Sequence, residues 1–234
     1  MFNILTDVLF PRVCPICGGL APPFSEGICP PCKRRLVYAS EPYCMKCGKP
    51  VDDHEEYCSD CENRPHAYDE GRAALIYDEY MSKSIYSFKY NKKQEFAPFY
   101  AKVMYERLGR KIRSWNIDVI VPVPIHKKRL KVRGYNQAGL IAKQLSKLTK
   151  IPTDEHLVVR RTATNALKDL DAMSRQNNLK KAFKVTQNSV KYTSVLIVDD
   201  IYTTGATVDA MARCLKGAGV EKVYFATLCI GRGI

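Results

Sequence analysis

Eight of the ten cysteines lie in four Cys-x-x-Cys pairs near the start of the 234-residue chain. Thiolates at this spacing can share one metal ion, and two such pairs complete the tetrahedral shell that zinc prefers. The sequence therefore predicts two structural zinc ions. The alternative, four disulfides in a small secreted domain, needs an oxidising compartment, of which the sequence gives no sign. The predicted ligands are Cys14, Cys17, Cys29, Cys32, Cys44, Cys47, Cys58 and Cys61.

The first and third pairs are each followed by a glycine, Gly18 or Gly48, which accepts the positive φ of a metal-binding knuckle. The second and fourth pairs are followed by Lys33 and Glu62, so a unit of two pairs occurs twice. This repeat favours sequential pairing, with two pairs on each ion, while crossed pairing stays open. Because so short a segment has little core, metal binding should supply most of its folding energy.

Two histidines near this repeat and the two remaining cysteines of the chain need a separate interpretation. His54 and His66 are alternative metal ligands by residue type, but we expect them to be solvated polar residues. Cys214 and Cys229 stand in an apolar helix and an apolar strand, where a buried structural role is the usual one. The zinc prediction therefore depends on the four cysteine pairs alone.

A second segment with the residue types for chemistry offers a site for a phosphate group. An apolar strand ends in two acids, Asp199 and Asp200, and a turn then leads into a helix. The turn supplies backbone N–H groups, hydroxyls and a helix N-terminus, which together suit one phosphate. The two carboxylates can hold ribose hydroxyls or, through water, a magnesium ion. The predicted phosphate-binding residues are Thr203, Thr204, Gly205, Ala206 and Thr207.

Strands and helices that alternate after about residue 70 must position this turn. Apolar strands separated by helices indicate an α/β fold with a mostly parallel sheet covered on both faces. Such sheets bind ligands at the carboxyl ends of their strands. We predict strands at 72–77, 117–123, 194–200 and 222–230, and helices at 95–113, 134–148 and 206–217. The predicted domains are a double zinc ribbon over 1–66 and an α/β domain over 67–234.

The net charge of +13 is unevenly distributed. Residues 1–66 hold seven Lys/Arg and nine Asp/Glu, which leaves 30 Lys/Arg and 15 Asp/Glu for the rest of the chain. No acid occurs between Asp118 and Asp154, where eight lysines and arginines lie. A field of this sign attracts the phosphates of a small metabolite or of nucleic acid. The residues predicted to bind pyrophosphate or DNA are Lys127, Lys128, Arg129 and Arg133.

The string VLIVDDIYTTGAT, residues 195–207, resembles the signature of type I phosphoribosyltransferases, which bind phosphoribosyl pyrophosphate (PRPP). The resemblance implies that Asp199 and Asp200 are catalytic residues that contact the ribose, and that the turn after them holds the 5′-phosphate. It also implies that magnesium binds together with PRPP. The family's pyrophosphate loop follows an earlier strand, and the basic segment that begins at Lys127 fits it in place and in charge.

The whole chain is similar to one branch of that family, the ComF competence proteins, which join a zinc ribbon to this domain. Its RGYNQ hallmark is matched at 133–137, and its R-x-x-N-x-x-x-A-F pattern at 175–183. The branch commonly has glutamine where Leu167 stands, which weakens any role for the 160–178 loop. The segment 157–183 would serve as a hood that excludes water.

The resemblance implies two functions. The first is phosphoribosyl transfer from PRPP to a nitrogen nucleophile; purine salvage members have an aspartate where Thr203 stands, so we expect a non-purine acceptor. The second, which we favour, is the handling of imported single-stranded DNA in the cytoplasm during natural transformation. The basic domain would then grip the DNA backbone, while the slightly acidic ribbons would contact a protein of the uptake machinery. Five aromatic residues near Lys89 and Lys92 could stack bases, although most are expected to be core: Tyr77, Tyr80, Tyr86, Phe88 and Tyr90.

No stretch of the sequence approaches the roughly 18 apolar residues that a membrane span needs. The first residues, with Asp7 inside an apolar stretch and no basic flank, are atypical of a signal peptide. A short amphipathic helix that packs onto the body is the preferred interpretation of this segment. A cytoplasmic location is therefore expected.

Overall fold

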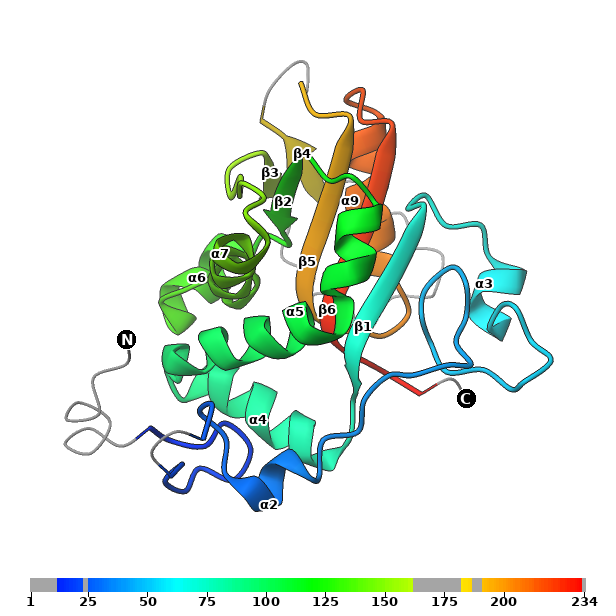
Figure 1. Ribbon diagram of the computed structural model, residues 1–234. Coiled ribbons are helices and arrows are strands. Elements are labelled where there is room, and N and C mark those ends of the chain that lie inside the picture. Colours follow the sequence, from blue (N-terminus) through cyan, green and yellow to red (C-terminus); the bar gives the residue numbers. More distant parts are fainter. Residues whose placement is uncertain (1–11, 23–24, 162–181, 187–190, 233–234) are drawn as a thin grey trace, which may run out of the picture.

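The computed structural model describes residues 12–22, 25–161, 182–186 and 191–232. Its centre is a sheet of four parallel strands in the order β1-β6-β5-β2 (Figure 1). These strands are β1 (Glu70–Ile76), β2 (Val119–Pro122), β5 (Ser194–Tyr202) and β6 (Lys222–Ile230). The predicted α/β class and parallel sheet are confirmed. The predicted amphipathic helix at the start of the chain lies outside the described residues.

Helices cover both faces of the sheet. On one face α4 (Glu79–Tyr90), α5 (Ala97–Ser114) and α7 (Gln137–Thr149) form a hydrophobic core with Leu196 and Val198 of β5. On the other face α9 (Ala206–Lys216) packs where Val195 and Ile197 of the same strand point. Successive side chains of a strand point to opposite faces, so β5 is buried on both sides. This two-sided burial fixes the strand that leads into the phosphate turn.

Smaller elements surround this framework. The short helix α6 (Lys127–Arg133) follows β2, and a 3-10 turn (Gln94–Phe96) precedes α5. Two strands, β3 (Val158–Arg160) and β4 (Phe183–Val185), pair antiparallel and frame the predicted hood. Residues 162–181, most of that hood, lie outside the described part of the chain.

The two cysteine-rich units lie on either side of the sheet edge formed by β1. Each contains a short helix that begins directly after a cysteine, α2 (Pro30–Lys33) after Cys29 and α3 (Ser59–Asn63) after Cys58. The segment between the units runs along β1, where the N–H of Ala39 donates to the carbonyl of Ala74 over 3.1 Å. This pairing covers backbone groups that the edge strand would otherwise expose.

Two helices of the second domain, α4 and α6, were not among the predicted elements, and neither were the short helices α2 and α3. In α4 the buried residues Met81, Ser84, Ile85 and Phe88 recur at helical spacing, and the side chain of Asp78 caps the first turn. These signals were available in the sequence, but the aromatic residues between them obscured the period. In the described part of the chain, no helix combines the length and the apolar character needed to cross a membrane.

Candidate functional site

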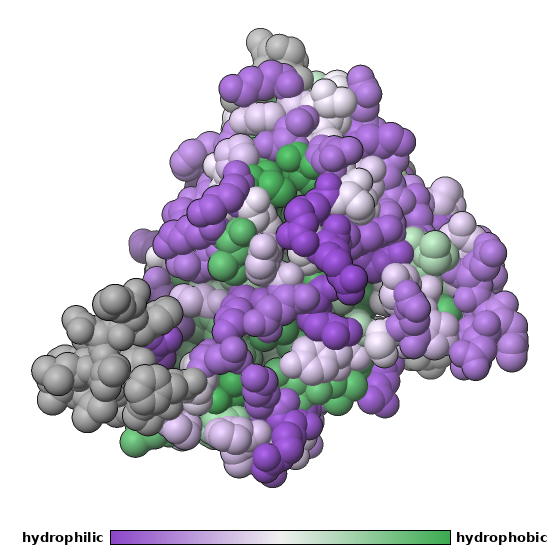
Figure 2. Space-filling view, viewed as in Figure 1, coloured by the Kyte–Doolittle hydropathy of each residue, from purple (hydrophilic) through white to green (hydrophobic). Residues whose placement is uncertain are grey.

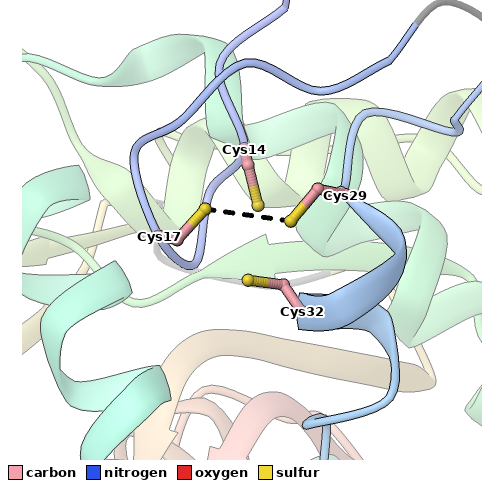
Figure 3. A group of neighbouring side chains, drawn as sticks. All are labelled: Cys14, Cys17, Cys29 and Cys32. Carbon is pink, nitrogen blue, oxygen red and sulfur yellow. Dashed lines mark hydrogen bonds between the residues drawn. The ribbon is translucent and has the colours of Figure 1, made fainter.

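The eight predicted ligands form two four-cysteine clusters. Within each cluster the sulfur atoms all lie within 4.8 Å of one another. In the first cluster, two side chains come from a loop and two from the start of α2, and all four point toward one centre (Figure 3). The pairing is sequential, as the repeat favoured: Cys14, Cys17, Cys29 and Cys32 form one cluster, and Cys44, Cys47, Cys58 and Cys61 form the other.

The sulfur distances fit zinc. Cys17 and Cys29 are 3.8 Å apart between sulfurs, and Cys47 and Cys58 are 3.6 Å apart. A disulfide would need about 2.05 Å, whereas a tetrahedron with zinc–sulfur bonds of about 2.3 Å has edges of about 3.8 Å. Gly18 and Gly48 have φ of +75° and +78°, as the knuckles require. Both clusters therefore fit a structural zinc ion.

The phosphate turn lies at the junction of β5 and α9. Gly205 is the N-cap residue of α9 and has φ of +73°; it supplies no side-chain cap, so the first backbone N–H groups of this helix face the turn. Thr203 and Thr204 are exposed beside it. A Cβ on Gly205 would lie 2.4 Å from the hydroxyl oxygen of Tyr202, so only glycine fits this position. The turn thus has the backbone shape and the exposed hydroxyls of an anion site.

Asp199 and Asp200 stand just before this turn, near the carboxyl end of β5, and both lie within electrostatic reach of Lys89. Asp200 lies on the face covered by α4, where its carboxylate pairs with the ammonium of Lys89 over 2.6 Å. Asp199 accepts the backbone N–H of Asp200 through its own carboxylate over 2.9 Å. Burial and the neighbouring Asp200 charge raise the pKa of Asp199 well above its usual value.

The basic residues predicted to bind pyrophosphate or DNA lie on α6, which follows the carboxyl end of β2. β2 pairs with β5, so this helix and the phosphate turn follow adjacent strand ends. Lys127, Lys128 and Arg129 are exposed. Arg133 is half-buried and lies over the ring of Tyr90 at 5.2 Å. The face of the molecule seen in Figure 2 is mainly hydrophilic, with smaller hydrophobic patches.

The aromatic residues of α4 are more exposed than the sequence suggested. Phe88 is fully buried and Tyr77 packs against the core, as expected. Tyr80, Tyr86 and Tyr90 are exposed instead, with Tyr86 and Tyr90 at 59% and 60%. The last two rings contact each other with centroids 4.8 Å apart. The expectation that most of the five are core residues was therefore wrong, because the outer face of α4 faces solvent.

His66 is also not the solvated residue that we expected. Its side chain is 1% exposed, lies 3.4 Å from the Asp209 carboxylate and stacks on Tyr68. Asp209, in the first turn of α9, also accepts the backbone N–H of Ala67 over 2.6 Å. These contacts join the end of the second cysteine unit to the helix that carries the phosphate turn. Cys229 is buried and Cys214 half-buried, in agreement with structural roles.

The second cysteine unit reaches the phosphate turn through two tyrosines. The hydroxyls of Tyr68 and Tyr202 are 2.7 Å apart, and both side chains are buried. Lys46, between the two cysteines of the third pair, lies over the Tyr68 ring at 5.4 Å. Tyr202 is also the residue whose hydroxyl lies against Gly205. A continuous path of contacts therefore leads from the second cluster to the turn.

Family models divide the chain into two recognised parts. A double zinc ribbon domain matches residues 5–62, and a phosphoribosyl transferase domain matches residues 94–233. Competence protein F of Haemophilus influenzae is 31% identical over 90% of this chain and 93% of its own length. This chain belongs to the same family, the ComF proteins, as the resemblance in the sequence implied.

Other relatives carry related names. The DNA utilization protein YhgH of Escherichia coli is 30% identical over 87% of this chain and 90% of its own length. Competence protein ComFC of Bacillus subtilis is 29% identical over 83% and 80%. Among solved structures, a purine phosphoribosyltransferase from Pyrococcus horikoshii has 21% identity and a TM-score of 0.36, covering 56% of this chain and 72% of that chain. A likeness at this level says nothing of the substrate.

Several residues around the site were not identified from the sequence as part of it. Lys89 was considered only as a cation among aromatic residues, and Tyr68, Tyr202 and Asp209 were not considered. Arg160 in β3 was not considered either. Burial and the charge of Arg129 lower its pKa, while the charge of Asp199 raises it, so Arg160 lies within electrostatic reach of both residues. Tyr68, Lys89 and Arg160 come from segments far before the motif. Tyr202 stands inside the motif at a position to which no role was assigned, and Asp209 stands two residues after it. Only packing brings them together.

Proposed function

We propose that this protein handles imported single-stranded DNA in the cytoplasm during natural transformation, and that its phosphoribosyltransferase site binds PRPP or a nucleotide. The observation that carries the proposal is the glycine turn at Gly205, which presents uncapped helix amides beside exposed threonines within a family named for competence and DNA utilization. We also propose, as the sequence predicts, that the boundary between the zinc-ribbon domain and the phosphoribosyltransferase domain lies after residue 66.

In this proposal each part of the site has one task. Residues Thr203 to Thr207 bind the 5′-phosphate, and the acids before them serve the pentose. Magnesium would accompany PRPP and offset part of the charge of its pyrophosphate. The cations of α6 bind either the pyrophosphate or a DNA backbone, since both present the same anionic oxygens. The ribbons, with nine acids against seven bases in residues 1–66, contact a protein partner rather than DNA.

The exposed tyrosines of α4 support the DNA-binding part of the proposal. Tyr86 and Tyr90 contact each other on the surface, and Arg133 of α6 lies over Tyr90. Base stacking on aromatic rings contributes about 1–3 kcal/mol per base, and the nearby cations of α6 suit the phosphates between bases. Single-stranded DNA offers both groups together, whereas a duplex keeps its bases stacked inside.

A salt titration tests the DNA role. Affinity for a single-stranded oligonucleotide should fall steeply between about 0.05 and 0.5 M salt. Replacing Lys127, Lys128 and Arg129 together by alanine should weaken binding roughly 10- to 100-fold and lower the slope of log K against log salt by about 2. Salt-independent binding would contradict the proposal.

A matched control removes three cations elsewhere. Lys191, Lys216 and Lys222 lie at the edge of the sheet where the strands begin, away from α6. Their replacement by alanine changes the net charge equally and should leave most of the oligonucleotide affinity intact. If both triple variants lose the same affinity, only net charge matters, and α6 is not a DNA-binding element.

The alternative function is an active phosphoribosyltransferase with a non-purine acceptor. The match of residues 94–233 to the phosphoribosyl transferase domain favours it. In this reaction a nitrogen of the acceptor bonds to C1 of the ribose, the bond from C1 to the pyrophosphate oxygen breaks, and the acceptor nitrogen loses a proton. Cations of α6 would stabilise the charge on the departing pyrophosphate. Pyrophosphate release from PRPP with each nucleobase tests it, and rapid nucleotide formation from hypoxanthine or guanine would refute the non-purine assignment.

A further inference from the structure

The short helix α6 carries apolar side chains that its neighbours do not cover. Val132 is 85% exposed and Leu130 is 41% exposed, and both stand among the lysines and arginines of this helix. No other large apolar residue in the described part of the chain is as exposed as Val132. The phosphates that the cations of α6 would bind offer no apolar surface. These two side chains therefore have no task in the proposed function.

The second ribbon presents a surface of the opposite charge. Its acidic loop, residues 52–57, has the sequence DDHEEY, and all six residues are exposed. None of its four acids belongs to an ion pair within the described ranges of the chain. In the first ribbon, by contrast, Glu26 pairs with both Lys33 and Lys102. The acidic loop therefore keeps its negative charge available to a partner.

Two apolar side chains accompany this acidic loop. Tyr57, its last residue, is 41% exposed, and Met45 of the third cysteine pair is 52% exposed. The N–H of Met45 donates to the carbonyl of Glu56 over 2.8 Å, so Met45 lies directly beside the end of the loop. The acidic loop and α6 thus each expose two large apolar side chains among charges, and the charges have opposite signs.

One chain cannot bring these two surfaces together. α6 lies on one side of the sheet, and the second ribbon with α3 lies on the other side (Figure 1). A contact between the surfaces therefore joins two copies of the chain. Opposite charges steer such an encounter, and apolar side chains at its centre exclude water. Three lysines of α6 are exposed and form no ion pair with other described residues: Lys127, Lys128 and Lys131.

We propose that the acidic loop and Met45 of one copy dock on α6 of a second copy. The inference rests on the proposed function in one respect, because it names the protein partner that the proposed function gives to the ribbons. The contact joins two different surfaces on opposite sides of the chain, so it is heterologous and can continue beyond a pair. A docked copy covers the cations that would bind DNA. Self-association and oligonucleotide binding therefore compete.

Sedimentation velocity of the full chain with its zinc tests the proposal. The two surfaces are small, so we expect weak association, seen as a sedimentation coefficient that rises between about 1 and 200 µM protein. Salt screens exposed charges, and the association should weaken at least about 10-fold between about 0.05 and 0.5 M salt. A wild type that sediments as a monomer over the whole concentration range at low salt would overturn the proposal.

Charge reversal on both surfaces is the decisive experiment. Glu55→Lys with Glu56→Lys, and separately Lys127→Glu with Lys128→Glu, should each weaken self-association at least about 10-fold. An equimolar mixture of the two variants should associate again, because the reversed loop of one variant meets the reversed helix of the other. This recovery also shows that both variants are folded. A mixture that stays monomeric would mean that the two surfaces do not meet.

A matched charge control uses acids outside both surfaces. Glu106 of α5 and Glu221 before β6 are exposed. Glu106→Lys with Glu221→Lys changes the net charge as much as the reversal of the acidic loop does, and should leave self-association within about twofold of wild type. If it weakens self-association as much as the loop reversal does, only the net charge matters, and the docking proposal is wrong.

The exposed apolar residues separate docking from DNA binding. Val132→Ser and Tyr57→Ser remove apolar surface at constant charge, so each should weaken self-association about 3- to 10-fold. The affinity for a single-stranded oligonucleotide should stay within about twofold of wild type in both variants. Leu20→Ser is the control, because Leu20 is 67% exposed on the first ribbon and should affect neither measurement. Unchanged self-association of Val132→Ser would contradict docking on α6.

Addition of a single-stranded oligonucleotide distinguishes the inference from the function on which it rests. An oligonucleotide that binds α6 should return the wild type to the monomer. Assemblies that persist at a saturating oligonucleotide concentration would place the contact elsewhere and overturn the inference alone. If the reversed variants associate on mixing but the wild type binds no oligonucleotide, the DNA role is wrong and the docking of the ribbon on α6 stands.

Discussion

The two zinc ribbons have the same kind of ligands, four cysteines in two Cys-x-x-Cys pairs, but they lie against different parts of the second domain. The first contributes Ile16, Ile28 and Leu36 to the core of α4 and α5, and its Cys17 is exposed. The second has three buried cysteines that share a core with Tyr68 and Tyr202. The first ribbon thus covers a helical face remote from the phosphate turn, whereas the second supports the strand that carries it.

The contacts that hold the ribbons differ in kind as well as in place. Besides its apolar residues, the first ribbon uses an exposed salt bridge from Glu26 to Lys102 of α5, 2.8 Å long. Exposed pairs of this type contribute about 0–1 kcal/mol. The second ribbon uses buried polar contacts, including the bond from the Gly71 N–H to the Lys46 carbonyl. Removing one partner of a buried polar pair costs more, about 1–3 kcal/mol.

The largest expected effect comes from breaking one ribbon at a time. Cys47→Ser should release zinc from the second ribbon, lower the melting temperature by roughly 6–12 °C and abolish measurable phosphate binding. Cys17→Ser should release zinc from the first ribbon and leave phosphate binding within about twofold of wild type. Zinc content, thermal denaturation and calorimetry with phosphate measure these effects. Equal loss of phosphate binding in both variants would show that the ribbons do not differ in this respect.

The second effect concerns the end of the contact path. Gly205→Ala would force alanine into a positive φ and against the Tyr202 hydroxyl, so we expect phosphate affinity to fall at least about 10-fold and stability by about 1–3 kcal/mol. Gly219→Ala is the matched control, because Gly219 also has a positive φ but nothing within 4 Å of an added Cβ. The Gly219→Ala variant should be less stable than the wild type but should bind phosphate equally well. An unchanged phosphate affinity of the Gly205→Ala variant would show that the turn does not bind phosphate.

The sequence predicted those features that depend on local pattern. The cysteine spacing predicted both clusters, the glycine repeat favoured their sequential pairing without excluding crossed pairing, and the alternation of apolar strands with helices predicted the parallel sheet. The sequence could not show that Tyr68 meets Tyr202, since 134 positions separate them and neither stands in a motif that requires the contact. The burial of His66 escaped prediction for the same reason, because its partner Asp209 lies far along the chain in α9.

A third effect concerns Asp209, which joins the end of the second ribbon to α9. Burial alone would raise the pKa of Asp209, but the bonds from His66 and Ala67 and the charge of Arg213 outweigh it and lower the pKa. A carboxyl with a lowered folded-state pKa stabilises the protein above its unfolded value of about 3.9 and loses that contribution as the pH falls through the folded value.

Asp209→Asn should therefore cost about 1.5–3 kcal/mol at pH 7 and less at pH 3, where part of the carboxylate's contribution is lost. Urea denaturation at both pH values measures this difference. Glu26→Gln, which removes the exposed link of the first ribbon, is the control and should cost about 1 kcal/mol or less at pH 7. If both variants lose the same stability at pH 7, the buried contacts of Asp209 with the second ribbon stabilise the protein no more than the exposed salt bridge of the first ribbon does.

The smallest expected effect concerns the hydrogen bond between Tyr68 and Tyr202, which connects the second ribbon to the turn. Burial raises the pKa of both Tyr68 and Tyr202, so the pair stays protonated and hydrogen-bonded across the neutral range. Tyr68→Phe should cost about 1 kcal/mol of stability, because it leaves the Tyr202 hydroxyl without this partner. The double change to phenylalanine should cost less than the sum of the single changes, since it removes both hydroxyls together.

The phosphate affinity of these variants decides whether the hydroxyl pair transmits support to the turn. Tyr202 touches Gly205 and Tyr68 does not, so a change at Tyr68 can reach the turn only through the shared bond. We expect Tyr68→Phe to weaken phosphate binding two- to fivefold and to have no further effect once Tyr202 is phenylalanine. If the two changes act independently on phosphate binding, the hydrogen bond between the tyrosines does not support the turn. The second ribbon would then stabilise only the domain as a whole.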